Sequence, residues 1–569
     1  MREPDLVPPR TTTTSQYLLD RSLATLRSAA IDWSVRSLDD RIADLATIRA
    51  KTAEAAPDLV ADAVRAKGIG RELAGEEWVA GPLPVLRTTR FLQRTLEGIR
   101  RGAEVPLPDS AIRELPDGQV TVDVLPGDGW DRLLYPGWKA SVRMDPAIGR
   151  GQARHHLGGI HTKPETATSA VAVVLGAGNV SSIAPLDLVQ KLFVEGHVAM
   201  LKFNPINDYI GPYIEHAFSD LIGAGFVRTS YGGTDVGSHL VNHPEVDEVH
   251  ITGSEKSHDA IVFGAGTKGV ARKAKNETVL KKRITSELGN VSPVIVLPGQ
   301  WDRREISYQA ENVATQLLQN AGYNCTATKV VVLPEAWGQR EEFMELVGDK
   351  LAYRPDRKAY YPGSIERYRR VVEAGGAVRT YGSSADGLPP TIVDLDAEAD
   401  HPAFAEEAFC RVMASVTLPG VDAPDFLARA VEFCNDRLRG SLNVTLLVDK
   451  ATLKANRQVV ERAVDNLHYG TVGLNVWAAA GFPLGVTPWG AFPGHTLDDI
   501  GSGLGFVHNA RLVDRPQKTI IRAPFVLVPK PAWSVFHRRS SAALRKATRF
   551  EADPAWWKVP GLLASAMRP

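Results

Sequence analysis

The sequence contains few cysteines and no excess charge of either sign. Its three cysteines, Cys325, Cys410 and Cys434, are odd in number and far apart. This pattern does not fit a disulfide framework and favours a reducing, cytoplasmic location. Lysine plus arginine (66) equals aspartate plus glutamate (66). Because no net charge attracts the chain to nucleic acid, we expect no nucleic-acid partner.

Long apolar runs and a hydrophobic leader are also missing. The uncharged stretch 166–186 is interrupted by glycine, asparagine and proline, so we interpret it as a strand, a loop and a helix start, not as a membrane span. The first ten residues are charged and proline-rich, which predicts no secretory signal. The content of 44% hydrophobic and 23% charged residues is typical of a soluble globular protein. A length of 569 residues predicts two or three domains.

The N-terminal part has a helical pattern. Apolar residues recur at spacings of three and four over residues 15–96, and Ser37 is suited to start a helix. Residues 104–160 are irregular and rich in proline and glycine, which predicts a surface loop or hairpin. His155, His156 and His161 lie in or next to this segment without a recognisable ligand spacing, so we predict no metal site.

From residue 170 onward, short apolar runs alternate with helical segments. Strands are predicted at residues 171–176, 198–203, 227–230 and 249–251, and then at 294–297, 330–333, 414–418, 444–448 and 519–528. Such alternation predicts an α/β protein with a Rossmann-like, mostly parallel sheet followed by a second α/β domain. Ligands of these sheets bind at the carboxyl ends of the strands. A nucleotide would therefore lie against the loops at residues 176–182, 202–208 and 253–257.

Seven short motifs occur in order along the chain. They are LGAGNVS (175–181), LK (201–202), ITGS (251–254), SELG (286–289), NAGYNC (320–325), EEAF (406–409) and TPWGAF (487–492). In this order and at these separations the chain resembles the aldehyde dehydrogenase superfamily from about residue 21 to residue 529. The resemblance implies oxidation of an aldehyde to a carboxylate, a cofactor domain, a catalytic domain and a small β bridging element used in oligomerisation.

The resemblance also implies the catalytic residues. Cys325 would be the nucleophile that adds to the aldehyde, and Glu287 the general base that hydrolyses the thioester. The side-chain amide of Asn179 and the backbone N–H of Cys325 would stabilise the oxyanion. From the residues alone, each has a simpler alternative: a buried apolar cysteine, a charged residue at a helix or strand boundary, and a turn residue.

The cofactor residues follow from the same resemblance. Lys202 would bind the adenine ribose, Gly253 and Ser254 would lie near the pyrophosphate, and Glu407 and Phe409 would hold the nicotinamide ribose. A solvated lysine, an exposed helix charge and a core aromatic ring are the alternatives for Lys202, Glu407 and Phe409. Pro205 stands where many NAD-preferring members carry an acid, so the predicted cofactor is NAD or NADP.

Several positions depart from the family pattern. Tyr323 replaces a glutamine before the nucleophile, Asn290 and His258 stand where glycine is usual, and Cys410-Arg411 replace Gly-Pro. Two other functions therefore stay open. One is an acylating dehydrogenase or acyl reductase that exchanges the thioester with coenzyme A, and the other is a catalytically silent scaffold. Glu287 favours hydrolysis, because acylating relatives commonly lack a glutamate there.

We expect four parts: residues 1–284 with the N-terminal helices, the dinucleotide-binding domain and a bridging element at 141–170; the catalytic thiol domain at 285–490; a return segment with an oligomerisation strand at 491–529; and a C-terminal extension at 530–569. The family implies a homodimer or larger homo-oligomer, with strands near 141–170 and 519–528 pairing between subunits. The extension carries eight lysines or arginines, two acids and several aromatic residues. It would contact a membrane surface, pack on a partner subunit or pack on its own domain.

Overall fold

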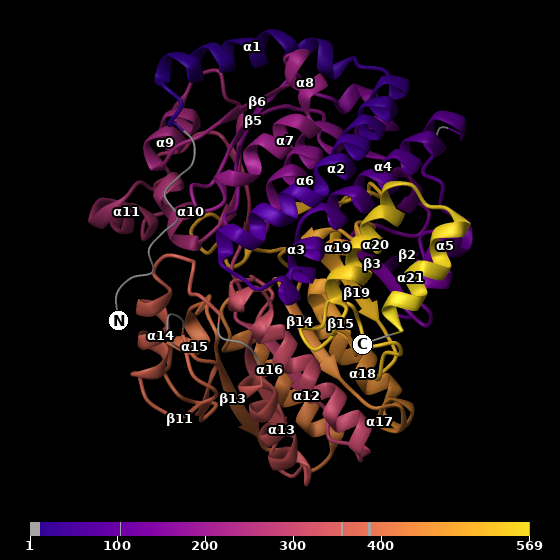
Figure 1. Ribbon diagram of the computed structural model, residues 1–569, viewed down its shortest axis with the longest axis vertical. Coiled ribbons are helices and arrows are strands. Elements are labelled where there is room, and N and C mark those ends of the chain that lie inside the picture. The colour runs from indigo at the N-terminus through magenta and orange to yellow at the C-terminus, as the bar shows by residue number, and fades with distance from the viewer. Residues whose placement is uncertain (1–11, 103, 354–356, 385–387, 568–569) are drawn as a thin grey trace.

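The computed structural model describes residues 12–102, 104–353, 357–384 and 388–567. Two large sheets organise the chain, a six-stranded sheet in the upper half of Figure 1 and an eleven-stranded sheet in the lower half. The α/β fold class predicted from the alternation of strands and helices is confirmed. The first ten residues, in which we predicted no secretory signal, lie outside the described part of the chain.

The six-stranded sheet has the order β17-β8-β7-β4-β5-β6. Its strands are β4 (Val171–Leu175), β5 (Val198–Lys202), β6 (Val227–Ser230), β7 (Glu248–Gly253), β8 (Arg283–Leu288) and β17 (Gly503–Leu504). All neighbours are parallel except β17 and β8. The carboxyl ends of β4, β5 and β7 therefore lie at the same end of the sheet. Its helices are α6 (Ile183–Val189), α7 (Gly211–Ala217), α8 (Ser219–Gly223), α9 (Thr234–Asn242), α10 (Glu255–Val262) and α11 (Gly266–Lys273).

The eleven-stranded sheet has the order β1-β2-β3-β19-β15-β14-β9-β10-β13-β12-β11. Its central strands are β9 (Ser292–Val296), β10 (Thr328–Pro334), β13 (Val412–Leu418), β14 (Asn443–Leu447) and β15 (Thr471–Leu474), with β12 (Thr391–Leu395) and β11 (Ala377–Thr380) at one edge. Apolar side chains of α12 (Arg303–Leu318) and α13 (Arg340–Ala352) pack in one core cluster, and those of α16 (Ala423–Asp436) and α18 (Arg457–Asn466) in another. The sheet is thus covered on both faces.

The strands expected to bridge subunits pair within the chain. β1 (Ile112–Glu114), β2 (Val120–Leu125) and β3 (Lys139–Met144) form an antiparallel extension, β3 pairs with β19 (Pro516–Arg522), and β19 pairs in parallel with β15. The bridging element was predicted too late in the sequence, because residues 153–166 contain only short 3-10 helices. The strand predicted at 519–528 ends at Arg522. The predicted boundary between residues 284 and 285 lies inside β8.

Four N-terminal helices lie across the upper half, as the pattern over residues 15–96 predicted (Figure 1). They are α1 (Gln16–Ser34), α2 (Leu38–Lys67), α3 (Gly75–Ala80) and α4 (Pro82–Gly102). Ser37 accepts a hydrogen bond from the backbone N–H of Asp40 and so caps α2, as predicted. In α2 the buried residues recur with helical spacing, so this helix presents one face to the core, whereas α4 is buried on all sides over residues 82–92.

The C-terminal extension packs on its own chain. It forms α20 (Ser540–Ala552) and α21 (Val559–Ala566), and α20 lies against α3 and α4. Phe536 is 7% exposed, whereas Trp556 and Trp557 are 72% and 76% exposed, so only part of its aromatic content serves the core. Among the described residues, no helix is both long enough and apolar enough to cross a membrane.

Candidate active site

Cys325 lies between a strained turn and a buried strand. Leu318 ends α12, and the following Asn320, Ala321 and Gly322 have φ angles of 52°, 54° and 79°. A Cβ atom on Gly322 would meet the backbone of Cys410 at 2.7 Å, so this close approach requires glycine. The turn directs the chain back toward β10 and leaves Cys325 partly exposed. Non-glycine residues in the left-handed region are strained, so contacts with the surrounding structure have to stabilise this turn.

The side chain of Asn320 holds this turn together. Its amide nitrogen donates to the carbonyls of Asn179 and Tyr323, both at 3.1 Å, and its amide oxygen accepts from Lys67 at 3.0 Å and Tyr360 at 2.8 Å. Lys67 is 3% exposed and also pairs with Glu77 at 2.9 Å. The N-terminal helices α2 and α3 therefore position the nucleophile loop.

Sequence reasoning did not find these supporting residues. Lys67 is the last residue of α2, 253 positions before Asn320, and has no motif around it. Glu76 accepts the backbone N–H of Asn320 at 2.9 Å and forms an ion pair with Arg357. In the sequence, these residues are visible only as charged positions in or at the ends of predicted helices. Charged positions of this kind are equally common on solvent-exposed helices.

Glu287 lies beside Cys325. It is the penultimate residue of β8 and is 3% exposed, and its carboxyl group interacts with the Cys325 thiol. Burial, together with the negative charge of Asp187, raises the pKa of Glu287 to about 8. Burial and the carboxylates of Glu287 and Glu407 raise the pKa of Cys325 well above its usual range. Both groups therefore carry their protons near neutral pH.

Asp187 of α6 carries a fixed negative charge near this pair. It is 1% exposed and lies 3.5 Å from Nε2 of His250 and 3.7 Å from Nε2 of His508. Although its burial acts in the opposite direction, His250 and His508 lower the pKa of Asp187 to about 2. Thr252 also donates to Asp187 at 3.1 Å. Asp187 is thus ionised whenever Glu287 titrates, and this favours the neutral form of Glu287.

Asn179 lies in the loop after β4 and faces the nucleophile turn. Its side-chain nitrogen donates to the carbonyl of Tyr323 at 2.9 Å, two residues before Cys325. This bond uses one of the two amide protons and fixes the direction of the second. Asn179 is 7% exposed, so its amide is held and not free in solvent. The alternative of a turn residue is compatible with this arrangement.

Glu407 and Phe409 approach the same site from the segment before β13. Burial raises the pKa of Glu407 to about 7, although the charges of Lys329 and Arg367 oppose it. A Cβ atom on Gly289 would lie 2.0 Å from a carboxylate oxygen of Glu407, so the glycine of the SELG motif makes room for this acid. Phe409, with a φ of 43°, packs against Tyr361 with ring centroids 4.9 Å apart.

The remaining predicted cofactor residues lie at the carboxyl ends of strands in the six-stranded sheet. Lys202 ends β5 and is 9% exposed, and burial lowers the pKa of its amine to about 8. No carboxylate in the described part of the chain forms an ion pair with it. Gly253 ends β7, and the side chain of Ser254 caps the first turn of α10 by accepting from Ser257. The phosphate groups of a ligand would compensate the charge of Lys202 and accept hydrogen bonds from free backbone N–H groups at the start of α10.

The departures from the family pattern are integrated into the core. Tyr323 is 1% exposed and stacks on Tyr361 at 5.6 Å. Asn290 donates to Ser292 at 3.1 Å, and Ser292 donates to the carbonyl of Cys325 at 3.0 Å. His258 is fully buried in α10. The unusual residues at 323 and 290 therefore support the nucleophile loop.

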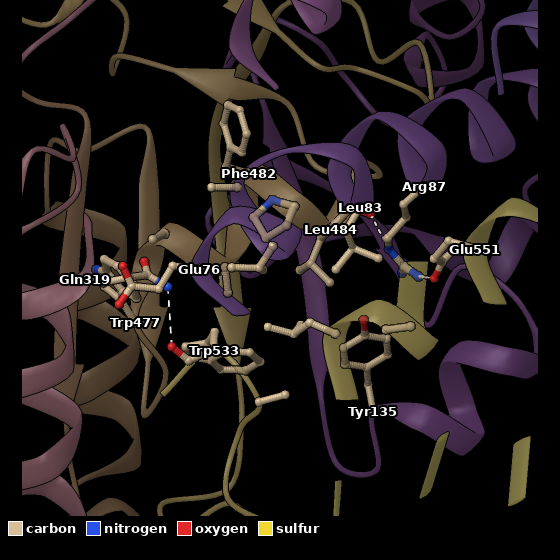
Figure 2. Close-up of a pocket in the computed structure, with 18 of the residues that line it drawn as sticks. Glu76, Leu83, Arg87, Tyr135, Gln319, Trp477, Phe482, Leu484, Trp533 and Glu551 are labelled. Atoms are coloured by element: carbon tan, nitrogen blue, oxygen red, sulfur yellow. Dashed lines mark hydrogen bonds and ion pairs between the residues drawn. The ribbon is translucent and has the colours of Figure 1, made fainter. Parts of the chain in front are cut away.

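A cavity of about 300 Å³ opens onto Cys325. In Figure 2, Gln319 and Trp477 lie on one side, Leu83 and Leu484 in the middle with Tyr135 below them, and Arg87 and Glu551 on the other side. The indole N–H of Trp477 donates to the carbonyl of Thr326 at 2.9 Å, so the Trp477 side is the side of the nucleophile. Cys325 is the one cysteine of the chain that lines this cavity, whereas Cys410 and Cys434 are buried.

The chain is similar in sequence to known aldehyde dehydrogenases. A model described as the aldehyde dehydrogenase family matches residues 196–354. The chain is 27% identical over 278 residues to 1-pyrroline-5-carboxylate dehydrogenase 2 of Bacillus subtilis, covering 46% of this chain and 48% of that protein. It is 23% identical over 287 residues to aldehyde dehydrogenase LUC3 of Fusarium, covering 46% and 57%. The matched region thus spans about half the length of the curated relatives.

Solved structures extend the likeness over nearly the whole chain. Aldehyde dehydrogenase C of Pseudomonas syringae, in complex with NAD+ and octanal, has a TM-score of 0.61 at 17% identity, covering 93% of this chain and 94% of that one. The NADP-dependent glyceraldehyde-3-phosphate dehydrogenase of Bacillus halodurans has a TM-score of 0.58 at 16% identity, covering 90% and 92%. These matches establish that the chain has the fold of aldehyde dehydrogenases. The sequence matches show similarity to aldehyde dehydrogenases over about half of the chain.

Proposed function

We propose that this chain is an NAD(P)-dependent dehydrogenase that oxidises an aldehyde to a carboxylate through a thioester on Cys325. One observation carries the proposal: a cysteine that lines a largely apolar cavity interacts with a buried carboxyl group, that of Glu287. A thiol and a base in contact are what covalent catalysis of aldehyde oxidation requires. The fold and the family matches support the same reaction class.

The first step forms the bond between sulfur and carbon. Ionised Glu287 takes the proton of the Cys325 thiol, the sulfur adds to the aldehyde carbon, and the carbonyl electron pair moves to oxygen. The free N–H of the Asn179 amide and the backbone N–H of Cys325 donate to this oxyanion, and such donors contribute about 3 kcal/mol each. Bound NAD(P) supplies the acceptor for the hydride that leaves this carbon.

The second step releases the product. Glu287, after returning its first proton to solvent, takes a proton from water as the water oxygen attacks the thioester carbonyl. The carbon–sulfur bond then breaks, Cys325 recovers a proton and the carboxylate leaves. The raised pKa of Glu287, about 8, suits a base that has to take protons in both steps.

The residues that would hold NAD(P) suit a dinucleotide. Lys202 is a desolvated cation without a carboxylate partner among the described residues. It ends β5, and the exposed Gly253 and Ser254 follow β7, one strand away across β4 at the same carboxyl end of the sheet. Glu407, adjacent to Gly289, would accept hydrogen bonds from a ribose. Pro205 offers no charge against a 2′-phosphate, so either NAD or NADP fits.

The name of the Bacillus relatives indicates a substrate that carries a carboxylate. We do not extend that substrate to this chain. A carboxylate buried in the cavity would need a free cation, and the one cationic residue that lines the cavity, Arg87, is already paired with Asp131 and Glu551 at 2.7 Å each.

We also propose a cytoplasmic homodimer. The three free cysteines fit a reducing compartment. In the single chain, β19 already occupies the edge of β15, so a dimer would form by another surface or by exchange of β1–β3 and β19 between subunits. Light scattering on the purified protein tests the mass directly.

Reduced-nicotinamide formation across an aldehyde panel tests the activity, with NAD and NADP, and with and without coenzyme A. We expect turnover without coenzyme A and none in Cys325→Ala. Strict dependence on coenzyme A would replace hydrolysis by acyl transfer. Absence of both turnover and cofactor binding would indicate a silent scaffold. Cys434→Ala, a buried cysteine far from the cavity, is the matched control.

A further inference from the structure

The C-terminal extension forms one wall of the cavity that ends at Cys325. From this extension Trp533, Leu544, Phe550, Leu563 and Ala566 line the space. Leu83 of α4 and Phe482 and Leu484 of the segment before β16 (Trp489–Gly490) form the opposite wall. In Figure 2, Trp533 of the extension lies near Gln319, and Glu551 of the extension meets Arg87. The segment beyond residue 529 is therefore part of the substrate site.

Every charged side chain that lines the cavity is paired. Glu77 pairs with Lys67 at 2.9 Å, and Glu76 forms an ion pair with Arg357. The two oxygens of Glu551 pair with Arg87 and Arg90, both at 2.7 Å. Because charge on these residues is already compensated, no lining group is left to recognise an ionic substrate.

The far side of the cavity is closed by the paired Arg87. Its Nε donates to the carbonyl of Leu484 at 2.8 Å, and its two terminal nitrogens donate to Glu551 and Asp131 at 2.7 Å. Arg87 lies opposite Gln319 and Trp477 in Figure 2, with Leu83 and Leu484 between them. A substrate that enters this space therefore meets apolar side chains first and a saturated guanidinium last.

From this arrangement we infer that the protein acts on aliphatic aldehydes of medium or long chain, whose hydrocarbon tail lies in the cavity against residues 530–569. The inference rests on the proposed function, because it requires the carbonyl group to reach Cys325. A volume of about 300 Å³ is within the range of pockets that enclose a whole ligand, and exceeds the need of a two- or three-carbon aldehyde. Each methylene removed from water is expected to raise kcat/KM roughly threefold to fourfold until the cavity is full.

The experiment measures kcat/KM for propanal, hexanal and decanal, and for succinic semialdehyde as an aldehyde with a terminal carboxylate. Two variants on the same helix are compared. Ala566→Trp introduces an indole into the cavity, and Ala564→Trp introduces the same side chain at an exposed position of α21. Neither residue belongs to the catalytic machinery.

We expect kcat/KM to rise from propanal to decanal and succinic semialdehyde to be the poorest substrate. Ala566→Trp is expected to lower kcat/KM for decanal at least about tenfold while changing that for propanal less than about twofold, because only the longer chain reaches the indole. Ala564→Trp should alter neither. Equal losses for propanal and decanal in Ala566→Trp, or no loss for decanal, would overturn the inference.

Binding separates this inference from the proposed function. Calorimetric titration of Cys325→Ala with decanal requires no turnover. Binding of decanal that Ala566→Trp weakens, in a protein that oxidises no aldehyde, would retain the apolar site and reject the reaction. Oxidation of propanal without detectable binding of decanal would retain the reaction and reject the site assigned to the extension.

Discussion

The carboxyl group of Glu287 and the thiol of Cys325 lie in contact, and both have a pKa raised by burial. They come from different sheets, Glu287 from β8 of the six-stranded sheet and Cys325 from the turn before β10 of the eleven-stranded sheet. The pair therefore forms only when the two sheets are correctly docked. Before reaction, the base Glu287 and the nucleophile Cys325 are both protonated.

Glu287→Gln should separate hydride transfer from hydrolysis. The amide cannot take a proton from water, so the thioester on Cys325 should accumulate. We expect a burst of reduced nicotinamide close to one per subunit, followed by a steady rate at least about a hundredfold below that of the unmodified protein. Rapid-mixing absorbance records both phases. A normal steady rate would remove Glu287 from the role of base, and Glu277→Gln, at an exposed position, is the control.

The pH dependence of turnover should report the charge of Asp187. Glu287 has to be ionised to act as a base, so activity should rise with pH through its pKa of about 8. Asp187→Asn removes a negative charge that raises this pKa, so the rising limb should move to lower pH. Profiles of kcat against pH measure the midpoint. Asp220→Asn, at an exposed residue of α8, should leave it unchanged, and an unmoved midpoint in Asp187→Asn would contradict the coupling.

The parallel strands were predictable because their signals are local. β4, β5 and β10 are continuous buried apolar runs bounded by glycine or polar turns, as expected for strands covered on both faces. β8 was missed because its sequence, RITSEL, mixes polar and apolar residues. β3 was expected only loosely, as part of a bridging element at 141–170, because its partner is β19, where Lys139 pairs with Arg522, and such pairing leaves no local pattern.

The chemical residues of the site were predictable from motifs, but their support was not. Cys325, Glu287 and Asn179 each stand in a short recognisable sequence, and the structure brings them together. Lys67 and Glu76 act on the same loop from positions that look like ordinary helix charges. For the extension the sequence left open a membrane surface, a partner subunit or its own domain, and nothing in the spacing of its apolar residues indicated that they face the cavity of Cys325.

Asn320 should be required for activity through both its backbone and its amide. Asn320→Ala removes five hydrogen bonds and puts alanine at a φ of 52°. Each buried polar partner left unpaired costs about 1–3 kcal/mol, so we expect kcat to fall by roughly tenfold to a hundredfold or more. Asn320→Gly retains the backbone conformation, and its smaller loss isolates the amide.

The control for this series is Asn276, which is exposed and has a φ of 53° far from the cavity. Asn276→Ala carries the same backbone strain and should change kcat less than about twofold, since a strain of about 1 kcal/mol there affects stability alone. Circular dichroism first confirms that all three variants fold. Their kcat values then show whether the Asn320 amide is required for activity. An Asn320→Ala enzyme as active as Asn276→Ala would show that the loop holds its shape without the amide.

Glu551 should anchor the C-terminal extension to the N-terminal helices. It is 4% exposed, and although burial opposes this, the charges of Arg87 and Arg90 lower its pKa. A lowered pKa means that the stabilisation is present above the pKa of the unfolded carboxyl group and is lost as pH falls through the folded value. Glu551→Gln breaks two buried ion pairs and leaves Arg87 and Arg90 with one carboxylate partner each, Asp131 and Asp128, which costs about 3 kcal/mol. Hydrogen exchange of the α20 amides should therefore accelerate by at least about a hundredfold at neutral pH.

Asp553→Asn is the matched comparison, because Asp553 follows α20 and its side chain is 80% exposed while it pairs with Lys558. An exposed pair contributes about 1 kcal/mol or less, so exchange in α20 should change only slightly. At a pH below the lowered pKa of Glu551 the unmodified protein should approach the exchange rate of Glu551→Gln, because the carboxyl group is then neutral in both. Equal protection of α20 in the two variants at neutral pH would mean that apolar packing by residues such as Leu544 and Phe550, and not the ion-pair cluster, holds the extension in place.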